Sequence, residues 1–99
     1  MYKEQLLKEI LEFSERKSKL FFTYEEFYIY LYYKYRKIFP FSSIARSLRR
    51  LAKQGFLIRR KVPSKEWGFC YRVEFYPVKY KIRLYLRKRQ LAETKPLTP

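Results

Sequence analysis

Gly55, one of only two glycines in the chain, separates two kinds of apolar periodicity. Before it, Ile44, Leu48 and Leu51 recur at the three- and four-residue spacing of an amphipathic helix. After it, residues 56–62 form a short segment between turn residues, and residues 71–75 alternate between apolar and polar side chains as a strand does. A glycine just past a helix readily takes the left-handed conformation that ends the helix. We therefore predict that a helix ends at Gly55 and that a strand follows it over residues 56–62.

Two further helices are predicted upstream. Residues 2–19 carry apolar residues at helical spacing, with glutamate in the early turns and basic residues in the last, which suits the helix dipole. The apolar segment 20–22 is too short for a helix and is expected to be an extended link. Thr23 followed by Glu26 is a capping box, so a second helix is predicted to run from there to about Lys37.

The second helix has two apolar faces. The following residues form one stripe and are assigned to the core: Tyr24, Phe27, Tyr28, Leu31, Tyr35 and Ile38. Ile29, Tyr30 and Tyr33 fall on the opposite side. This second face needs a cover, which is either the last strand of the chain or a second subunit.

The third helix is expected to begin after Pro40, because the residue before a proline is disfavoured in the helical conformation. Ser42 or Ser43 can cap it. The inner face comprises Ile44, Ala45, Leu48, Leu51 and Ala52. The outer face comprises Ser43, Arg46, Ser47, Arg50 and Lys53. One side of this helix is therefore free of any role in the core.

A basic hairpin is predicted next, with a loop over 63–68 and a returning strand over 69–75. Trp67 either closes the hairpin as a core aromatic or contacts a partner from its tip. The single Cys70 has no second cysteine to pair with and is expected to be a small buried or half-buried residue. The Arg59-Arg60-Lys61 run either contacts a partner or protects an edge strand from aggregation.

The segment from Val78 to Leu86 carries an apolar residue at every even position. We predict a strand from this period, although the leucine, arginine and lysine content also suits a helix. Residues 92–99 contain two prolines and are expected to form a loose tail. The length of 99 residues then indicates one domain over 1–91.

Charge is distributed very unevenly. Lys and Arg number 24 against 9 Glu, which gives a formal net charge of +15. Residues 1–31 hold five basic and six acidic residues, whereas residues 32–99 hold nineteen and three. The second part of the chain is thus predicted to contact a polyanion.

Missing residue types exclude several functions. The chain has no His, Asp or Asn. Without His there is no Ser–His or Cys–His catalytic pair, and one Cys cannot build a zinc site. We therefore expect no enzymatic activity, no metal and no cofactor.

We also see no bilayer-spanning segment and no signal peptide, so a cytoplasmic location is expected. The scarcity of amides beside abundant Lys and Glu suggests a hot environment.

Twelve residues are the candidate contacts to double-stranded DNA: Ser42, Ser43, Arg46, Ser47, Arg49, Arg50, Lys53, Arg59, Arg60, Lys61, Lys65 and Arg72. Arg46 and Arg50 lie one turn apart and each can reach a guanine edge with two hydrogen bonds. Arg49 lies to one side and is better placed for phosphate. The alternative is that the charged outer face of the third helix contacts only solvent.

The order of helix, short strand, helix, turn, serine-capped helix, glycine and basic hairpin resembles that of winged helix-turn-helix DNA-binding proteins. The residues that carry this resemblance are Ser43, Ile44, Leu48, Leu51, Gly55 and Leu57. The resemblance implies an α+β fold with the third helix in the major groove and the hairpin wing on the backbone or minor groove. Small size and aromatic richness further resemble regulators of crenarchaeal viruses and their hosts, for which the location would be the host cell interior.

Four functions remain open on this basis. The first is sequence-specific DNA binding in transcription, and the second is non-specific DNA packaging. Single-stranded nucleic-acid binding and a protein adaptor role are the others. We also predict a homodimer built largely from residues after Pro77, because an edge strand there would pair with its copy in a second chain.

Overall fold

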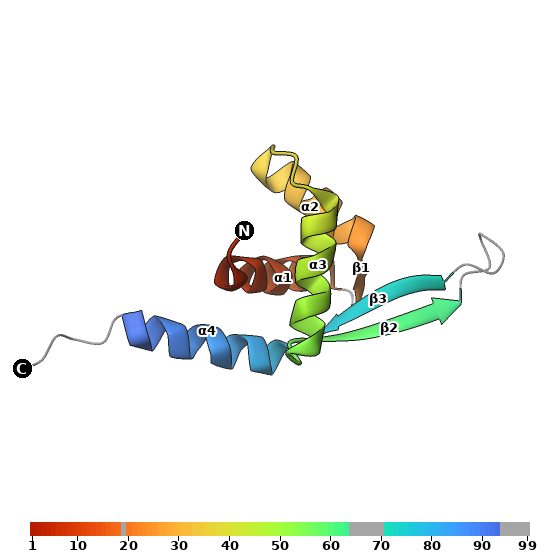
Figure 1. Ribbon diagram of the computed structural model, residues 1–99. Helices are drawn as coiled ribbons and strands as arrows, with labels where there is room; N and C mark the ends of the chain where they lie inside the picture. Colours follow the sequence, from red (N-terminus) through yellow and green to blue (C-terminus); the bar gives the residue numbers. More distant parts are fainter. Residues whose placement is uncertain (19, 64–70, 94–99) are drawn as a thin grey trace, which may run out of the picture.

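The computed structural model of the chain describes residues 1–18, 20–63 and 71–93, with side chains described up to residue 90. Within these residues the protein has a mixed α+β fold of four helices and one three-stranded antiparallel sheet (Figure 1). The elements are α1 (Lys3–Lys17), β1 (Phe22–Thr23), α2 (Tyr24–Tyr35), α3 (Phe41–Lys53), β2 (Leu57–Pro63), β3 (Tyr71–Pro77) and α4 (Lys79–Glu93). The predicted α+β class is confirmed.

The predicted start of α2 is confirmed. Thr23 is the N-cap, and its side-chain oxygen accepts a hydrogen bond from the backbone N–H of Glu26 at 3.3 Å. The helix ends at Tyr35, two residues before the expected Lys37, because Arg36 takes a left-handed conformation with φ of 52°. Ile38 therefore lies beyond the helix and is exposed, contrary to its assignment to the core.

α3 begins after Pro40 as expected, but its cap differs from the prediction. Pro40 is the N-cap, and its carbonyl accepts hydrogen bonds from the N–H groups of Ser43 and Ile44 at 3.1 and 3.2 Å. Neither Ser42 nor Ser43 caps the helix, since both lie inside its first turn. The ring of Phe41 packs against α2, with its centroid 5.3 Å from that of Tyr28, which fixes the helix start ahead of the two serines.

Gly55 ends α3 as predicted. Its φ is +86°, and its N–H donates to the carbonyl of Ala52 at 3.1 Å. The N–H of Phe56 donates to the carbonyl of Leu51 at 3.0 Å. This pair of bonds is the Schellman arrangement, which satisfies the last carbonyls of a helix and turns the chain into the following strand.

The sheet has the order β1-β3-β2. β2 and β3 form the expected hairpin, paired from Leu57–Pro77 at one end to Pro63–Tyr71 at the other. The extended link predicted over 20–22 includes the start of β1, which pairs Phe22 with Phe75 and Thr23 with Glu74. Three positions with sequence predictions, Lys65, Trp67 and Cys70, fall outside the described residues.

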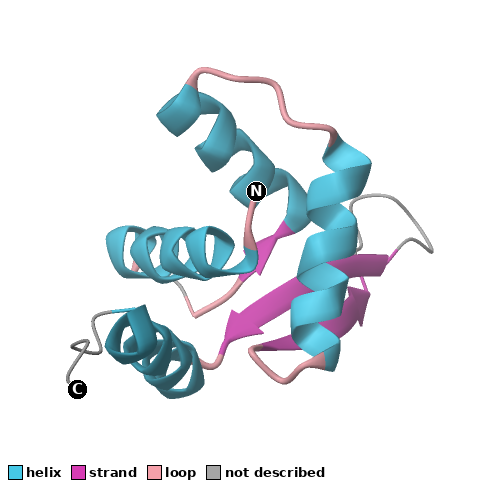
Figure 2. Ribbon diagram, turned by 60° about the vertical axis from the view of Figure 1, so that its left-hand side comes forward, coloured by secondary structure: helices cyan, strands magenta, loops and turns pink. Residues whose placement is uncertain are grey.

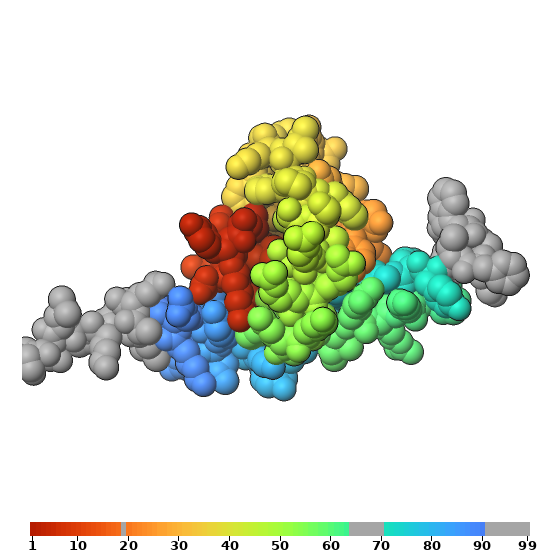
Figure 3. Space-filling model, in the orientation of Figure 1, coloured from red at the N-terminus to blue at the C-terminus, as the bar shows by residue number. Residues whose placement is uncertain are grey.

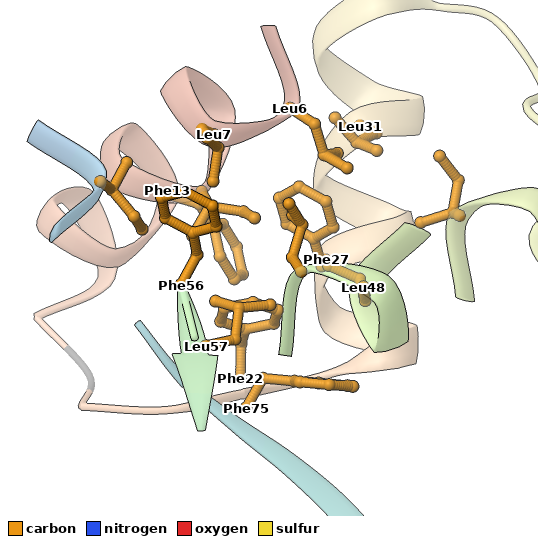
Figure 4. Close-up of a cluster of buried hydrophobic side chains, with 14 residues drawn as sticks. Leu6, Leu7, Phe13, Phe22, Phe27, Leu31, Leu48, Phe56, Leu57 and Phe75 are labelled. Carbon is orange, nitrogen blue, oxygen red and sulfur yellow. The ribbon is translucent and has the colours of Figure 1, made fainter. Parts of the chain in front are cut away.

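Phenylalanine and leucine side chains from α1, β1, α2, α3 and the hairpin form one core (Figure 4). Phe13, Phe22, Phe27 and Phe75 are the largest fully buried side chains. The Phe22 ring lies 5.8 Å from the ring of Phe13 in α1 and 5.3 Å from that of Phe27 in α2, which joins β1 to the helical layer. This core fixes α3 against the base of the hairpin.

The strand predicted from Val78 to Leu86 is wrong, because residues 79–86 lie in α4. Val78 donates its N–H to the carbonyl of Phe56, and its own carbonyl then accepts from the N–H groups of Lys81 and Ile82. Ile82 is buried, whereas Tyr80 and Leu84 are 75% and 51% exposed. Helix-forming composition thus prevails over the alternating period. The expected tail boundary at residue 92 also falls inside α4, which extends to Glu93.

α4 lies beside α1 (Figure 2). Glu4 near the start of α1 pairs with Arg89 at 3.0 Å, and Glu15 near its end pairs with Arg83 at 2.7 Å, so the two helices run in opposite directions. The edge-strand pairing expected for a homodimer is therefore wrong, since no strand follows Pro77 within the described residues. The homodimer itself stays a prediction.

Candidate nucleic-acid interface

α3 projects its basic residues away from the core. Ile44, Leu48 and Leu51 are buried against the helices and sheet behind it. The exposed residues on its outer side are Ser42, Ser43, Arg46, Arg49, Arg50 and Lys53. In Figure 3 the helix protrudes as a ridge between the start of α1 on one side and β2 on the other. The predicted division into an inner and an outer face is confirmed for the buried side.

Five cations gather around one hollow between α3 and β2, with a volume of about 850 Å³. These cations are Arg46, Arg49, Arg50, Lys53 and Arg59. Ala52, Gly55, Leu57 and Ile58 form the rest of its lining. The sequence contains no acidic residue between Glu26 and Glu66, so no carboxylate from these elements offsets the positive charge. The hollow is a candidate site for an extended polyanion.

The register of the hairpin divides its cations between two faces. Residues that pair directly across antiparallel strands share a face, and successive residues alternate. Arg59 pairs with the buried Phe75, so it lies on the same face as the core and α3. Lys61 shares that face farther along β2, whereas Arg60 pairs with Glu74 on the opposite face.

Arg72 is held by a partner within the protein. Its Nη2 and Nε atoms donate to the carboxylate of Glu74 at 2.7 and 3.2 Å, and its guanidinium lies 5.8 Å from the centre of the Phe21 ring. Glu74 is only 3% exposed and also accepts from the hydroxyl of Tyr76 at 2.9 Å. That hydrogen bond raises the pKa of Tyr76. The structure therefore places Arg60 and Arg72 apart from the α3–β2 hollow.

Ser47 differs from the other two serines of α3. It is half-buried and lines a smaller hollow of about 200 Å³ between α3 and the first turn of α1. Lys3, Arg50 and Gln54 line the same hollow. Arg50 is common to both hollows, and it therefore lies on the crest of the ridge.

Two lysines near the end of α3 were absent from the sequence-based set. Lys81 donates from Nζ to the carbonyl of Gln54 at 2.8 Å, and Lys3 lies 4.8 Å from the centre of the Phe56 ring. Because residues 78–86 were interpreted as a strand, Lys81 was not expected to lie near the end of α3. Lys3 lies 38 positions before the first residue of α3, and no local pattern brings them together.

A buried carboxylate joins α1 to α2 on another side of the molecule. Glu9 accepts hydrogen bonds from the hydroxyls of Tyr30 and Tyr35 at 3.1 and 2.9 Å and from Nζ of Lys34 at 2.8 Å. Burial and the Glu9 charge raise the pKa of Tyr30 to about 12. Hydrogen bonds to Glu12 and Glu9 raise the pKa of Lys34. Together these contacts hold α1 and α2 in a fixed position relative to each other.

Two observations limit other kinds of site in the part of the chain that the structure describes. No group of three His, Cys, Asp or Glu side chains there is placed to bind a metal ion. None of its helices combines the length and the apolar character that crossing a bilayer requires. Comparisons with protein families, curated proteins and solved structures find no match to this chain.

Proposed function

We propose that this protein is a sequence-specific binder of double-stranded DNA of the winged-helix type, acting in transcription regulation. In this proposal α3 lies in the major groove, and the β2–β3 hairpin is the wing that contacts the adjacent backbone or minor groove. The observation that carries it is the convergence of five cations from α3 and β2 on one hollow beside a protruding helix.

The dimensions of α3 support this placement. An α-helix with its side chains is about 10–12 Å across, and the major groove of B-DNA is about 12 Å wide. Arg46 and Arg50 stand one turn apart on the exposed side of the ridge. Each carries a planar guanidinium that can donate two hydrogen bonds to guanine. The core behind α3 fixes the helix, so that the side chains present a preset geometry.

The position of the hairpin gives the second support. Arg59 faces the same hollow as the α3 cations, and Lys61 follows on the same face of β2. When α3 occupies the major groove, the phosphates along one edge of that groove lie on the side of α3 where Arg59 and Lys61 project. Charge-neutralising contacts of this kind supply affinity without sequence information.

The competing function is non-specific packaging of DNA, which the same net charge would serve. The two differ in the ratio of specific to non-specific affinity, not in affinity alone. Selection of bound duplexes from a random pool at moderate salt separates them. Enrichment of a motif, bound about 10³-fold or more tightly than a shuffled duplex, supports regulation. Tight binding without enrichment indicates packaging, and preference for single strands or absence of duplex binding would overturn the proposal.

A further inference from the structure

The smaller hollow on the second edge of α3 is also basic. It lies between the first turn of α1 and the side of α3 that faces away from β2, and Lys3 and Arg50 contribute its charge. Ser47 and Gln54 add polar side chains to the lining. Because Arg50 lines both hollows, α3 is a ridge with a cationic recess along each edge.

Aromatic rings hold the ammonium group of Lys3 at this edge. Its Nζ lies 4.8 Å from the centre of the Phe56 ring and 4.6 Å from that of Tyr85. The two rings meet edge to face with centroids 5.3 Å apart. Such cation–π contacts orient an ammonium group and leave its full positive charge in place. The adjacent carboxylate of Glu4 is occupied by Arg89, at 3.0 Å.

Lys81 brings a second cation to the same corner. Its Nζ lies 5.2 Å from the Phe56 ring and donates to the carbonyl of Gln54, the residue that follows α3. Lys3 and Lys81 thus approach one ring from two different helices. An anion near this ring would interact favourably with both ammonium groups.

We propose that Lys3, with Ser47 and Gln54, forms a second phosphate-binding edge that contacts a phosphodiester of the duplex backbone. The proposal rests on the placement of α3 in the major groove. That groove is bordered by two backbones, one from each strand. Arg59 is on the side of α3 that meets one backbone, and Lys3 is on the side that meets the other. α3 is thereby held in the groove from both edges.

The matched variants are Lys3→Gln and Lys8→Gln. Both residues lie on α1 and each substitution removes one positive charge, but Lys8 lines a separate hollow between α1 and α4. Each phosphate contact contributes about 0.9 to the slope of log affinity against log salt. K3Q should lower that slope by about 0.9, so that its loss of affinity is about threefold greater at 50 mM than at 200 mM salt. K8Q should leave the slope unchanged, and Lys3→Arg should restore it.

A measurement on the wild-type chain avoids any effect of K3Q on folding. Duplexes that carry a single neutral methylphosphonate at successive positions would be tested in turn. We expect weakened binding at two clusters of phosphates, one on each strand beside the same major groove. Sensitivity on one strand alone, or equal slopes for K3Q and K8Q, would overturn the second edge and leave the proposed function intact. Failure of the wild-type chain to bind any duplex would overturn both.

Discussion

Lys81 of α4 donates a hydrogen bond from Nζ to the backbone carbonyl of Gln54, 2.8 Å away, directly after the end of α3. Three residues earlier, Val78 donates its N–H to the carbonyl of Phe56 at 2.9 Å. The C-terminal helix is thus anchored at the corner where α3 turns into β2. The orientation of α3 relative to the hairpin therefore depends on α4, which follows the hairpin and is distant in sequence from α3.

Gly55→Ala should destabilise the protein by about 1–2 kcal/mol, because a non-glycine residue is disfavoured at the left-handed φ of +86°. An added Cβ would also meet the ammonium end of Lys81, which is flexible and can move. Urea unfolding followed by circular dichroism measures the change. If Gly55→Ala lowers the free energy of unfolding by the same amount in a Lys81→Ala background, the loss comes from the backbone conformation. Full recovery in that background would contradict this reading.

Arg46→Ala and Arg50→Ala should each weaken binding to the preferred duplex by about 1–3 kcal/mol and relax specificity at one base position. The reason is that a lost bidentate contact to guanine affects only sequences that present guanine there. Fluorescence anisotropy on the selected site and its single-base variants measures both effects. Arg87→Ala, an exposed arginine of α4, is the charge-matched control. Equal losses on every sequence would show that Arg46 and Arg50 contact phosphate only.

Arg59→Gln should reduce the salt dependence of DNA binding more than Arg72→Gln does. Arg59 lines the α3–β2 hollow, whereas Arg72 is bound to Glu74 at 2.7 Å on the other face of the hairpin. A lost phosphate contact should lower the slope by about 0.9, and Arg72→Gln should leave it nearly unchanged. Affinities between 50 and 200 mM salt give both slopes. The reverse order would mean that the opposite face of the hairpin meets the DNA.

Stability should decline at high pH through Tyr30. Its pKa rises from the ordinary 10.0 to about 12 in the folded protein, because burial and Glu9 disfavour the phenolate. A raised folded pKa stabilises the fold fully below pH 10 and progressively less as the pH rises toward 12. Unfolding by urea at several alkaline pH values measures this decline. Tyr30→Phe should make it shallower, and an unchanged profile would exclude Tyr30 as its source.

Leu84→Glu should convert the predicted homodimer into a monomer. Two-fold dimers match palindromic half-sites, and an interface needs an apolar centre. α4 exposes Tyr80 and Leu84 one turn apart, and this is the surviving candidate surface after Pro77. Tyr71→Glu makes the same charge change on the exposed end of the hairpin and should leave the assembly intact. Sedimentation equilibrium decides, and a monomeric wild-type chain at tens of micromolar would refute the dimer.

Local sequence signals correctly predicted where α2 begins and where α3 ends. The capping box at Thr23 and the glycine at Gly55 each act through one or two backbone hydrogen bonds, and the structure contains both. The segment after Pro77 was mispredicted because its even-numbered apolar residues fit a strand. In the structure α4 packs beside α1, and Ile82 is buried in the common core. That contact joins residues far apart in sequence, which no local period encodes.

The candidate site was predictable on α3 and less so elsewhere. The buried spacing of Ile44, Leu48 and Leu51 alone determines which α3 residues face outward. For the hairpin, the cations were not divided between faces from the sequence, and the pairing of Arg59 with the buried Phe75 in the structure makes that division. The placement of Lys3 beside α3 depends on the packing of three helices, so only the structure reveals it.

The sheet has three strands only where β1 pairs with β3, at Phe75 and Glu74. From Lys61 to Pro63 the hairpin is a two-stranded ribbon that extends away from the helices (Figure 1). A ribbon of this kind has little stability of its own, so we expect its outer end to open at a lower free-energy cost than the core. In the proposed complex, the outer end of the β2–β3 hairpin would therefore adapt to the local course of the DNA backbone, while α3 keeps a fixed shape.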